Sequence, residues 1–198
     1  MWQQLRQSPD WRFVALVIPF MVLLQAIGPE YLRYQQDLLE QGQLWRYLSA
    51  HWVHVGWMHL LLNALGLVIC VSLTHPGWST ARWLLYSVIL GIGISLLFTL
   101  YNPELSDYAG LSGVLFGLYL LSALSLYARD RLIALLIISA LVIKVTMEQT
   151  GFYDFNSGAL IGARVIVDAH LYGLLTAIAI ALVWARYTMN HRLKIQSN

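Results

Sequence analysis

Two residues in this sequence have side chains that could together start acyl-transfer chemistry. Ser112 lies between glycines in AGLSGVLFG (109–117), and His170 lies in DAHLYGLL (168–175). A serine hydroxyl becomes a nucleophile when a neighbouring base takes its proton, and histidine is the most frequent base. Either residue alone is most often structural. A fold that brought Ser112 to His170 would give a nucleophile and its base.

A second pair of polar residues lies in the apolar stretch HWVHVGWMHLLLNALGL (51–67). On a helix, His59 and Asn63 would be about 6 Å apart along the axis and about 40° apart around it, so they would share a face. Their N–H donors suit the stabilisation of an oxyanion. They suit interhelical hydrogen bonding equally well. The same geometry turns His54 away from His59, so we expect packing or interfacial roles for His54 and His51.

Two pairs of opposite charges also have helical spacing. Lys144 and Glu148 are four residues apart, and we expect an ion pair in which the lysine extends toward the membrane surface. Alternatively, the pair lines a gate or contacts a charged group of a substrate. Asp168 would lie about 160° from His170 around a helix, so we expect it to pair with Arg164. This geometry predicts a Ser–His dyad without a third member.

The elements that must position these residues are membrane-spanning helices. Of the 198 residues, 59% are hydrophobic and 11% are charged, and the mean hydropathy is +0.63. Soluble domains carry about 25% charged residues, and a spanning helix needs about 20 mostly apolar residues. The sequence predicts one all-α polytopic membrane domain over residues 1–198. Its six expected spans are residues 11–27, 50–73, 82–100, 110–127, 132–148 and 163–185.

The basic residues predict how these spans are oriented. Cytoplasmic loops of membrane proteins carry an excess of lysine and arginine. One side of the six-span arrangement has Arg6, Arg12, Arg82, Arg129, Arg131, Arg186, Arg192 and Lys194, and the other has Arg33, Arg46 and Arg164. Both termini are therefore expected in the cytoplasm. The polar residues that begin the second, fourth and sixth spans then lie in the outer half of the membrane.

Stripes of small residues predict that the fourth and sixth spans touch. Small residues let membrane helices approach closely. The stripes are Gly113 and Gly117 on the fourth span, and Gly173, Ala177 and Ala181 on the sixth. Ser112 precedes its stripe by one residue and His170 precedes its own by three. The mismatch of about 3 Å along the axis is small enough for the two side chains to meet.

The combined motifs resemble those of the rhomboid intramembrane serine proteases. The resemblance covers residues 44–67, 109–117 and 168–175, and the six-span layout also fits. It implies that Ser112 is the nucleophile and His170 the general base. It also implies that His59 and Asn63, with the backbone N–H of Ser112, form the oxyanion site.

The resemblance also places further residues at the site. Those expected to line it are Gly110, Leu111, Phe116 and Gly173. Many rhomboids have a tyrosine where this chain has Phe116, which keeps a ring for the imidazole to stack on but lacks the hydroxyl. Trp45 and Arg46 are similar to part of the family's membrane-embedded hairpin.

The stretches KVTMEQTG (144–151) and VIVDAHLYG (165–173) resemble the rhombosortase branch of the family. That branch is associated with Gram-negative proteins that carry a C-terminal Gly-Gly motif, a hydrophobic helix and a basic tail. The resemblance implies a membrane-anchored protein substrate, cleaved near the periplasmic side of the inner membrane. Lipid surrounds the chain in this interpretation, and we expect no cofactor, no metal and no nucleic-acid partner.

Two other functions compete with this interpretation. Rhomboid-like folds can bind membrane proteins without cutting them, although such chains usually lack the serine or the histidine. A metal-dependent protease or ion carrier would use His51, His54, His59 and Asp168, but the sequence has no H-E-x-x-H motif. For the protease, we expect a small hydrated cavity bounded by the second, fourth, fifth and sixth spans.

Overall fold

The computed structural model describes residues 9–74, 76–152 and 157–196, and every regular element in these ranges is a helix. The long helices are α1 (Trp11–Ile27), α4 (Trp57–Thr74), α5 (Thr80–Tyr101), α6 (Ser112–Leu126), α7 (Arg131–Thr150) and α9 (Asp168–Gln196). The short ones are η1 (Pro29–Tyr31), α2 (Gln36–Glu40), α3 (Arg46–Ser49) and α8 (Ser157–Ile161). Each of the six expected spans corresponds to one long helix, which confirms the predicted all-helical polytopic fold.

The long helices differ in how well they match the thickness of a membrane. Helices α4, α5, α7 and α9 are long and apolar enough to cross it, whereas α1 and α6 are apolar but have 17 and 15 residues. A helix of this length extends about 23–26 Å, less than the hydrocarbon core of about 30 Å. The chain is therefore a multi-pass membrane protein. Its helix α6 is shorter than the hydrocarbon core is thick.

The second span starts later than the sequence predicts. The expected span begins at residue 50, whereas α4 begins at Trp57. Gln25 on α1 holds the backbone of His54 from both sides: its Nε2 donates to the carbonyl oxygen at 3.0 Å, and its Oε1 accepts from the N–H at 2.8 Å. Because a side chain already binds these backbone groups, residues 50–56 form an ordered loop instead of the first turns of the helix.

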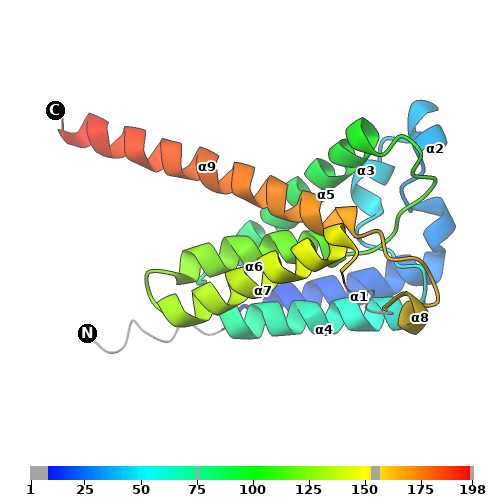
Figure 1. Ribbon diagram of the computed structural model, residues 1–198, viewed down its shortest axis with the longest axis horizontal. Coiled ribbons are helices and arrows are strands. Elements are labelled where there is room, and N and C mark those ends of the chain that lie inside the picture. Colours follow the sequence, from blue (N-terminus) through cyan, green and yellow to red (C-terminus); the bar gives the residue numbers. More distant parts are fainter. Residues whose placement is uncertain (1–8, 75, 153–156, 197–198) are drawn as a thin grey trace.

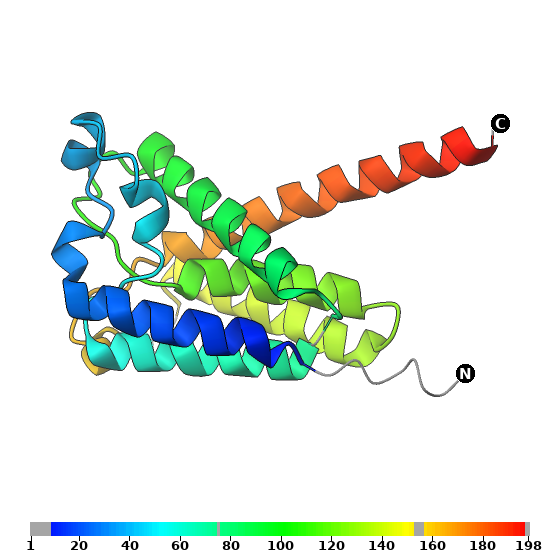
Figure 2. The same cartoon turned by 180° about the vertical axis from the view of Figure 1, so that it is seen from behind.

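Helix α6 occupies the centre of the bundle and contacts α4, α5, α7 and α9. Figures 1 and 2 show α1, α4, α6 and α7 running alongside one another, while α5 and α9 cross them obliquely. Beyond the contact with α6, the C-terminal half of α9 extends away from the bundle. The central helix is consequently the one from which a functional group can be surrounded by protein on several sides.

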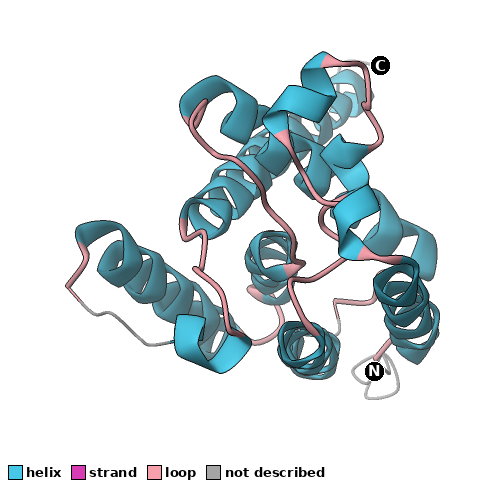
Figure 3. Ribbon diagram, turned by 90° about the vertical axis from the view of Figure 1, so that its right-hand side faces the viewer, coloured by secondary structure: helices cyan, strands magenta, loops and turns pink. Residues whose placement is uncertain are grey.

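Hydrogen bonds connect the loops at one end of the bundle, the end that faces the viewer in Figure 3. Buried Arg46 donates from Nη1 to the carbonyl oxygen of Arg33 at 2.6 Å and from Nε to Oε1 of Gln43 at 2.8 Å, which fixes the segment between α1 and α4. Tyr34 in this segment exchanges two backbone hydrogen bonds with Tyr108, at 2.9 and 3.1 Å. This bridge anchors the loop that leads into α6.

Candidate active site

Helices α6 and α9 touch through their glycines, as the small-residue stripes predict. A methyl group added at Gly173 would lie 2.0 Å from the carbonyl oxygen of Gly113, and one at Gly113 would lie 2.6 Å from that of Ala169. Real Cβ atoms essentially never come within 3.0 Å of another atom. Only glycine allows this approach, and it sets the distance between the first turns of the two helices.

The close approach brings Ser112 to His170. Oγ of Ser112 lies 3.0 Å from Nε2 of His170, within hydrogen-bonding distance. His170 is buried. The ring of Phe116, one turn after Ser112, stacks on it at a centroid distance of 4.2 Å and an interplanar angle of 8°. Phe116 therefore supports the face of the imidazole, and its missing hydroxyl is not needed for the stack.

The other imidazole nitrogen contacts a carboxylate that sequence reasoning did not place at the site. Nδ1 of His170 lies 2.8 Å from Oε2 of Glu148, near the end of α7. Lys144 donates to Oε1 of the same carboxylate at 2.5 Å, so the expected Lys144–Glu148 ion pair is present. The site therefore holds three side chains in line, whereas the spacing argument predicted a dyad. The available signal was the Lys144–Glu148 pair in a mainly apolar helix, but the distance from Glu148 to His170 depends on how α7 packs.

The prediction that Asp168 forms an ion pair with Arg164 is wrong. Asp168 accepts from Nδ2 of Asn102 at 3.0 Å and from Nε2 of Gln149 at 3.3 Å. The prediction assumed a helix through both residues, whereas α9 begins at Asp168. Arg164 lies in the preceding loop, where the four-residue spacing no longer places it on the same face.

His59, one of the two predicted oxyanion residues, lies beside the loop that leads to Ser112. Gly110 has a φ of +147°, and a methyl group on it would lie 2.7 Å from Cε1 of His59, so glycine is required by backbone conformation and by space. Asn63 is buried and donates from Nδ2 to the carbonyl oxygen of His59 at 3.2 Å. One of its amide hydrogens is thus used within α4.

The two remaining histidines are buried near the site. The ring of His54 meets that of His59 edge-on at 5.0 Å, which contradicts the expectation that it points away. The angle was calculated for a helix that does not include residue 54. Nε2 of His51 lies 2.9 Å from Oγ of Ser95 on α5. Burial lowers the pKa of His51 to about 4 and that of His54 to about 3, so both are neutral packing residues at neutral pH, in agreement with the packing role expected for them.

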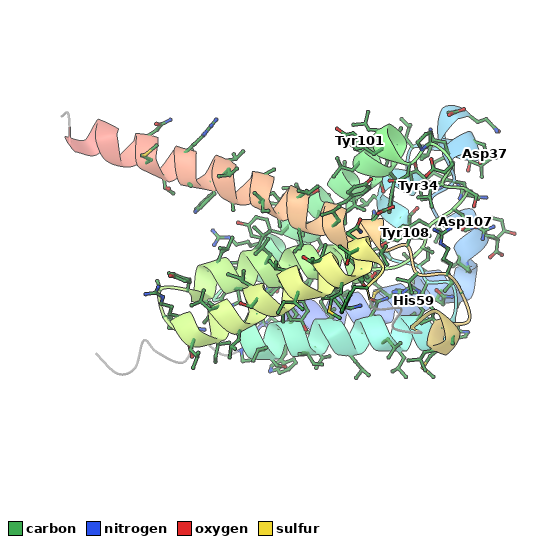
Figure 4. The ribbon with its side chains drawn as sticks, in the orientation of Figure 1. Tyr34, Asp37, His59, Tyr101, Asp107 and Tyr108 are labelled. Atoms are coloured by element: carbon green, nitrogen blue, oxygen red, sulfur yellow. The ribbon has the colours of Figure 1, made fainter. Side chains whose placement is uncertain are left out.

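A cavity of about 330 Å³ opens over Ser112 and His59. Its other lining residues are Val55, Asn102, Glu104, Leu105, Ser106, Asp107, Tyr108, Ala109, Ile161, Ala163, Arg164, Val165, Ile166, Val167 and Asp168. The walls are therefore mainly the loops before α6 and before α9, with no residue of α7, although we expected four spans to bound the cavity. Figure 4 shows His59, Asp107 and Tyr108 at this end of the molecule.

The four residues predicted to line the site surround it without forming the cavity wall. Gly110 packs on His59, Phe116 packs on His170, and Gly173 forms the helix contact. Leu111 is 1% exposed and belongs to the hydrophobic core. Gly110, Phe116 and Gly173 thus pack around His59, His170 and the helix contact, while the loop residues leave the space above Ser112 open.

Comparison with known proteins gives a match to the Rhomboid domain over residues 41–187. The chain is similar to Rhomboid-like protein 11, chloroplastic, of Arabidopsis thaliana, with 29% identity over 71% of this chain and 51% of the relative. It is also similar to RHOMBOID-like protein 2 of the same plant, with 37% identity over 42% of this chain and 26% of the relative.

A bacterial relative is described as a protease. Rhomboid protease GluP of Bacillus subtilis is 32% identical over 42% of this chain and 16% of the relative. The chain spans about half or less of the length of these three relatives. The domain match, by contrast, extends from the segment before α3 into α9 and contains Ser112, His170, His59 and Asn63.

Proposed function

Because the chain belongs to the rhomboid family, we propose that it is an intramembrane serine endopeptidase with Ser112 as nucleophile and His170 as general base. The observation that carries this proposal is the 3.0 Å contact between Oγ of Ser112 and Nε2 of His170. The two groups come from different helices, 58 residues apart in sequence. They meet under a cavity that reaches Ser112. The comparison with a relative described as a protease supports the same reaction.

The reaction follows from this geometry. Oγ of Ser112 attacks the carbonyl carbon of a peptide bond while its proton passes to Nε2 of His170. The protonated imidazole then gives the proton to the leaving amine as the C–N bond breaks, which leaves an acyl-enzyme. A water molecule entering through the cavity attacks this ester, and the same imidazole accepts and returns the proton. The polar cavity residues Asn102 and Asp168 provide a path along which water can reach the half-buried Ser112.

Three groups are the proposed hydrogen-bond donors to the oxyanion. Ser112 is the first residue of α6, so its N–H is one of the first-turn N–H groups that have no acceptor within the helix. The helix dipole also favours negative charge at this end. His59 lines the cavity beside Ser112, and Asn63 lies one turn further along the same helix. Nδ2 of Asn63 has a second hydrogen beyond the one donated to the carbonyl oxygen of His59.

We also propose that the substrate is a membrane-anchored protein with a C-terminal Gly-Gly anchor, cleaved near the periplasmic side of an inner membrane. The cavity lies at the end of the bundle opposite the start of α1 and the end of α9 (Figure 1). The excess of basic residues at the latter end favours its placement in the cytoplasm. A small cavity of about 330 Å³ suits glycines, which also let a substrate helix unwind at low cost.

Co-expression with candidate C-terminally anchored proteins tests this function. Mass spectrometry of the products should find a new C-terminus at or next to the Gly-Gly motif. Ser112→Ala should abolish the cut, whereas Ser125→Ala, which removes an exposed hydroxyl from the other end of the same helix, should leave it unchanged. Cleavage by Ser112→Ala at the normal rate would refute the assigned nucleophile. A chain that binds the anchor and never cuts it would be a binding protein.

A further inference from the structure

We propose that Glu148 is a positioning residue that makes the Ser–His pair into a Ser112–His170–Glu148 triad. This inference rests on the proposed function, since it concerns the same site. The carboxylate comes from α7, contacts neither Ser112 nor the cavity, and acts through His170. Its side chain is 8% exposed and that of His170 is 7% exposed, so the contact between them is almost completely shielded from solvent.

The first argument is a hydrogen-bond balance. An ionised carboxylate only accepts hydrogen bonds, so the 2.8 Å contact with Oε2 requires the proton of the neutral imidazole to lie on Nδ1. Nε2 is then unprotonated and faces the hydroxyl of Ser112 at 3.0 Å. The carboxylate thereby selects the one tautomer in which His170 can act as a base toward Ser112.

The second argument concerns charge and orientation. When His170 takes the proton of Ser112 it becomes a cation, and a carboxylate at 2.8 Å stabilises that cation. Phe116 fixes the plane of the ring by stacking, but the same stack is possible after a 180° flip about the Cβ–Cγ bond, which exchanges Nδ1 with Cδ2 and Nε2 with Cε1. A hydrogen bond from Nδ1 to Glu148 removes this freedom. The two contacts together direct Nε2 at Ser112.

The third argument is that the carboxylate is itself held in place. Lys144 donates to Oε1 and supplies the opposite charge that a buried carboxylate needs. The next residue of α7, Gln149, donates to Asp168 at the start of α9 at 3.3 Å. Two adjacent residues of α7 therefore bind two residues of the first turn of α9. Asp168 is engaged with Asn102 and Gln149, which leaves Glu148 as the carboxylate that contacts the imidazole.

The test uses the full chain in detergent and a fluorescent fluorophosphonate. In the labelling reaction Oγ of Ser112 bonds to phosphorus, the P–F bond breaks, fluoride leaves, and His170 takes the proton. Measuring the rate at several probe concentrations separates the maximal rate constant, kinact, from the binding constant, KI. Labelling of the unmodified chain at Ser112, located by mass spectrometry, must be shown first. Its absence would overturn the proposed function and this inference together.

Glu148→Gln should lower kinact by about 10²- to 10⁴-fold, the range expected when a triad carboxylate becomes an amide. Lys144 has donors only, so it holds the amide oxygen and turns the NH₂ group toward Nδ1 of His170. That arrangement forces the imidazole proton onto Nε2, the atom that must accept the proton of Ser112. KI should change less than about threefold, because Glu148 does not line the cavity. A merely structural role would not separate kinact from KI in this way.

A double variant provides the matched control. In Lys144→Met/Glu148→Gln the amide is free to turn its oxygen toward Nδ1, so kinact should recover at least about tenfold relative to Glu148→Gln alone. Glu148→Asp keeps the charge and should also be faster than Glu148→Gln. Glu40→Gln, at an exposed carboxylate on α2, should match the unmodified chain.

Three results would overturn the triad while leaving the proposed function intact. They are a kinact for Glu148→Gln within about threefold of the unmodified value, a double variant as slow as Glu148→Gln, or an equal loss from Lys144→Met alone. If Glu148→Gln does not yield folded protein, Glu148→Asp is compared with the double variant. The charge-retaining variant should then be the faster of the two, and equal rates would contradict the inference.

Discussion

Gly173→Ala should separate the two helices that hold Ser112 and His170, the proposed nucleophile and base. The added methyl would lie 2.0 Å from the carbonyl oxygen of Gly113, at least 1.0 Å closer than real Cβ contacts allow. The obstacle is backbone, which cannot rotate away, so α9 must move outward by about 1 Å at this point. The distance from Oγ of Ser112 to Nε2 of His170 would then rise from 3.0 Å to about 4 Å, beyond hydrogen-bonding range.

The expected loss of reactivity follows from this displacement. A misplacement of about 1 Å costs about 10²-fold in rate, and overpacking costs about 1–3 kcal/mol of stability. The assay is the kinact of fluorophosphonate labelling, measured together with the free energy of unfolding in detergent. Gly56→Ala is the matched control, because no atom lies within 4 Å of its added methyl. Labelling of Gly173→Ala at the unmodified rate would refute the claim that the glycine contact sets the Ser112–His170 distance.

Two further predictions concern the loops that carry the site. Arg46→Lys should lower the free energy of unfolding by about 2 kcal/mol, because the point charge of lysine cannot reproduce the separate hydrogen bonds to Arg33 and Gln43. The control, Arg186→Lys, lies on an exposed part of α9 and should change the free energy of unfolding little. Equal effects of the two substitutions would contradict this reasoning. Burial lowers the pKa of His54 to about 3. The unfolded chain therefore takes up a proton at His54 near pH 6.5, whereas the imidazole stays neutral in the folded chain. Stability should therefore fall as the pH drops from 7 to 5, by about 2 kcal/mol from this residue, and His54→Leu should remove that part of the difference between unfolding measured at pH 7 and at pH 5. An unchanged pH dependence in His54→Leu would show that His54 does not contribute.

Composition and helical spacing were sufficient to predict the long helices and the contact between two of them. Apolar runs identify spans because lipid cannot satisfy a non-helical backbone. The stripe from Gly113 to Gly117 on α6 and the one that begins at Gly173 on α9 predicted a close crossing, and the glycine contacts of the structure agree. The meeting of Ser112 with His170 follows from that crossing, because each lies at a fixed number of residues from its stripe.

Groups outside those two helices could not be placed from spacing. Periodicity relates residues of one helix to each other, whereas the distance from Glu148 to His170 depends on the position and rotation of α7 against α9. The residues at which helices start could not be predicted from spacing either. The side chain of Gln25, 29 residues away, binds the backbone of His54 and delays the start of α4. That shift brings His54 against His59.

The sequence by itself determined that the chain spans a membrane and which serine and histidine would meet, because both follow from local composition and from the geometry of single helices. Only the tertiary structure decided which carboxylate faces the imidazole and which loops surround the cavity. Those contacts join residues from separate elements, and their distances are set by packing that no repeat along the chain records.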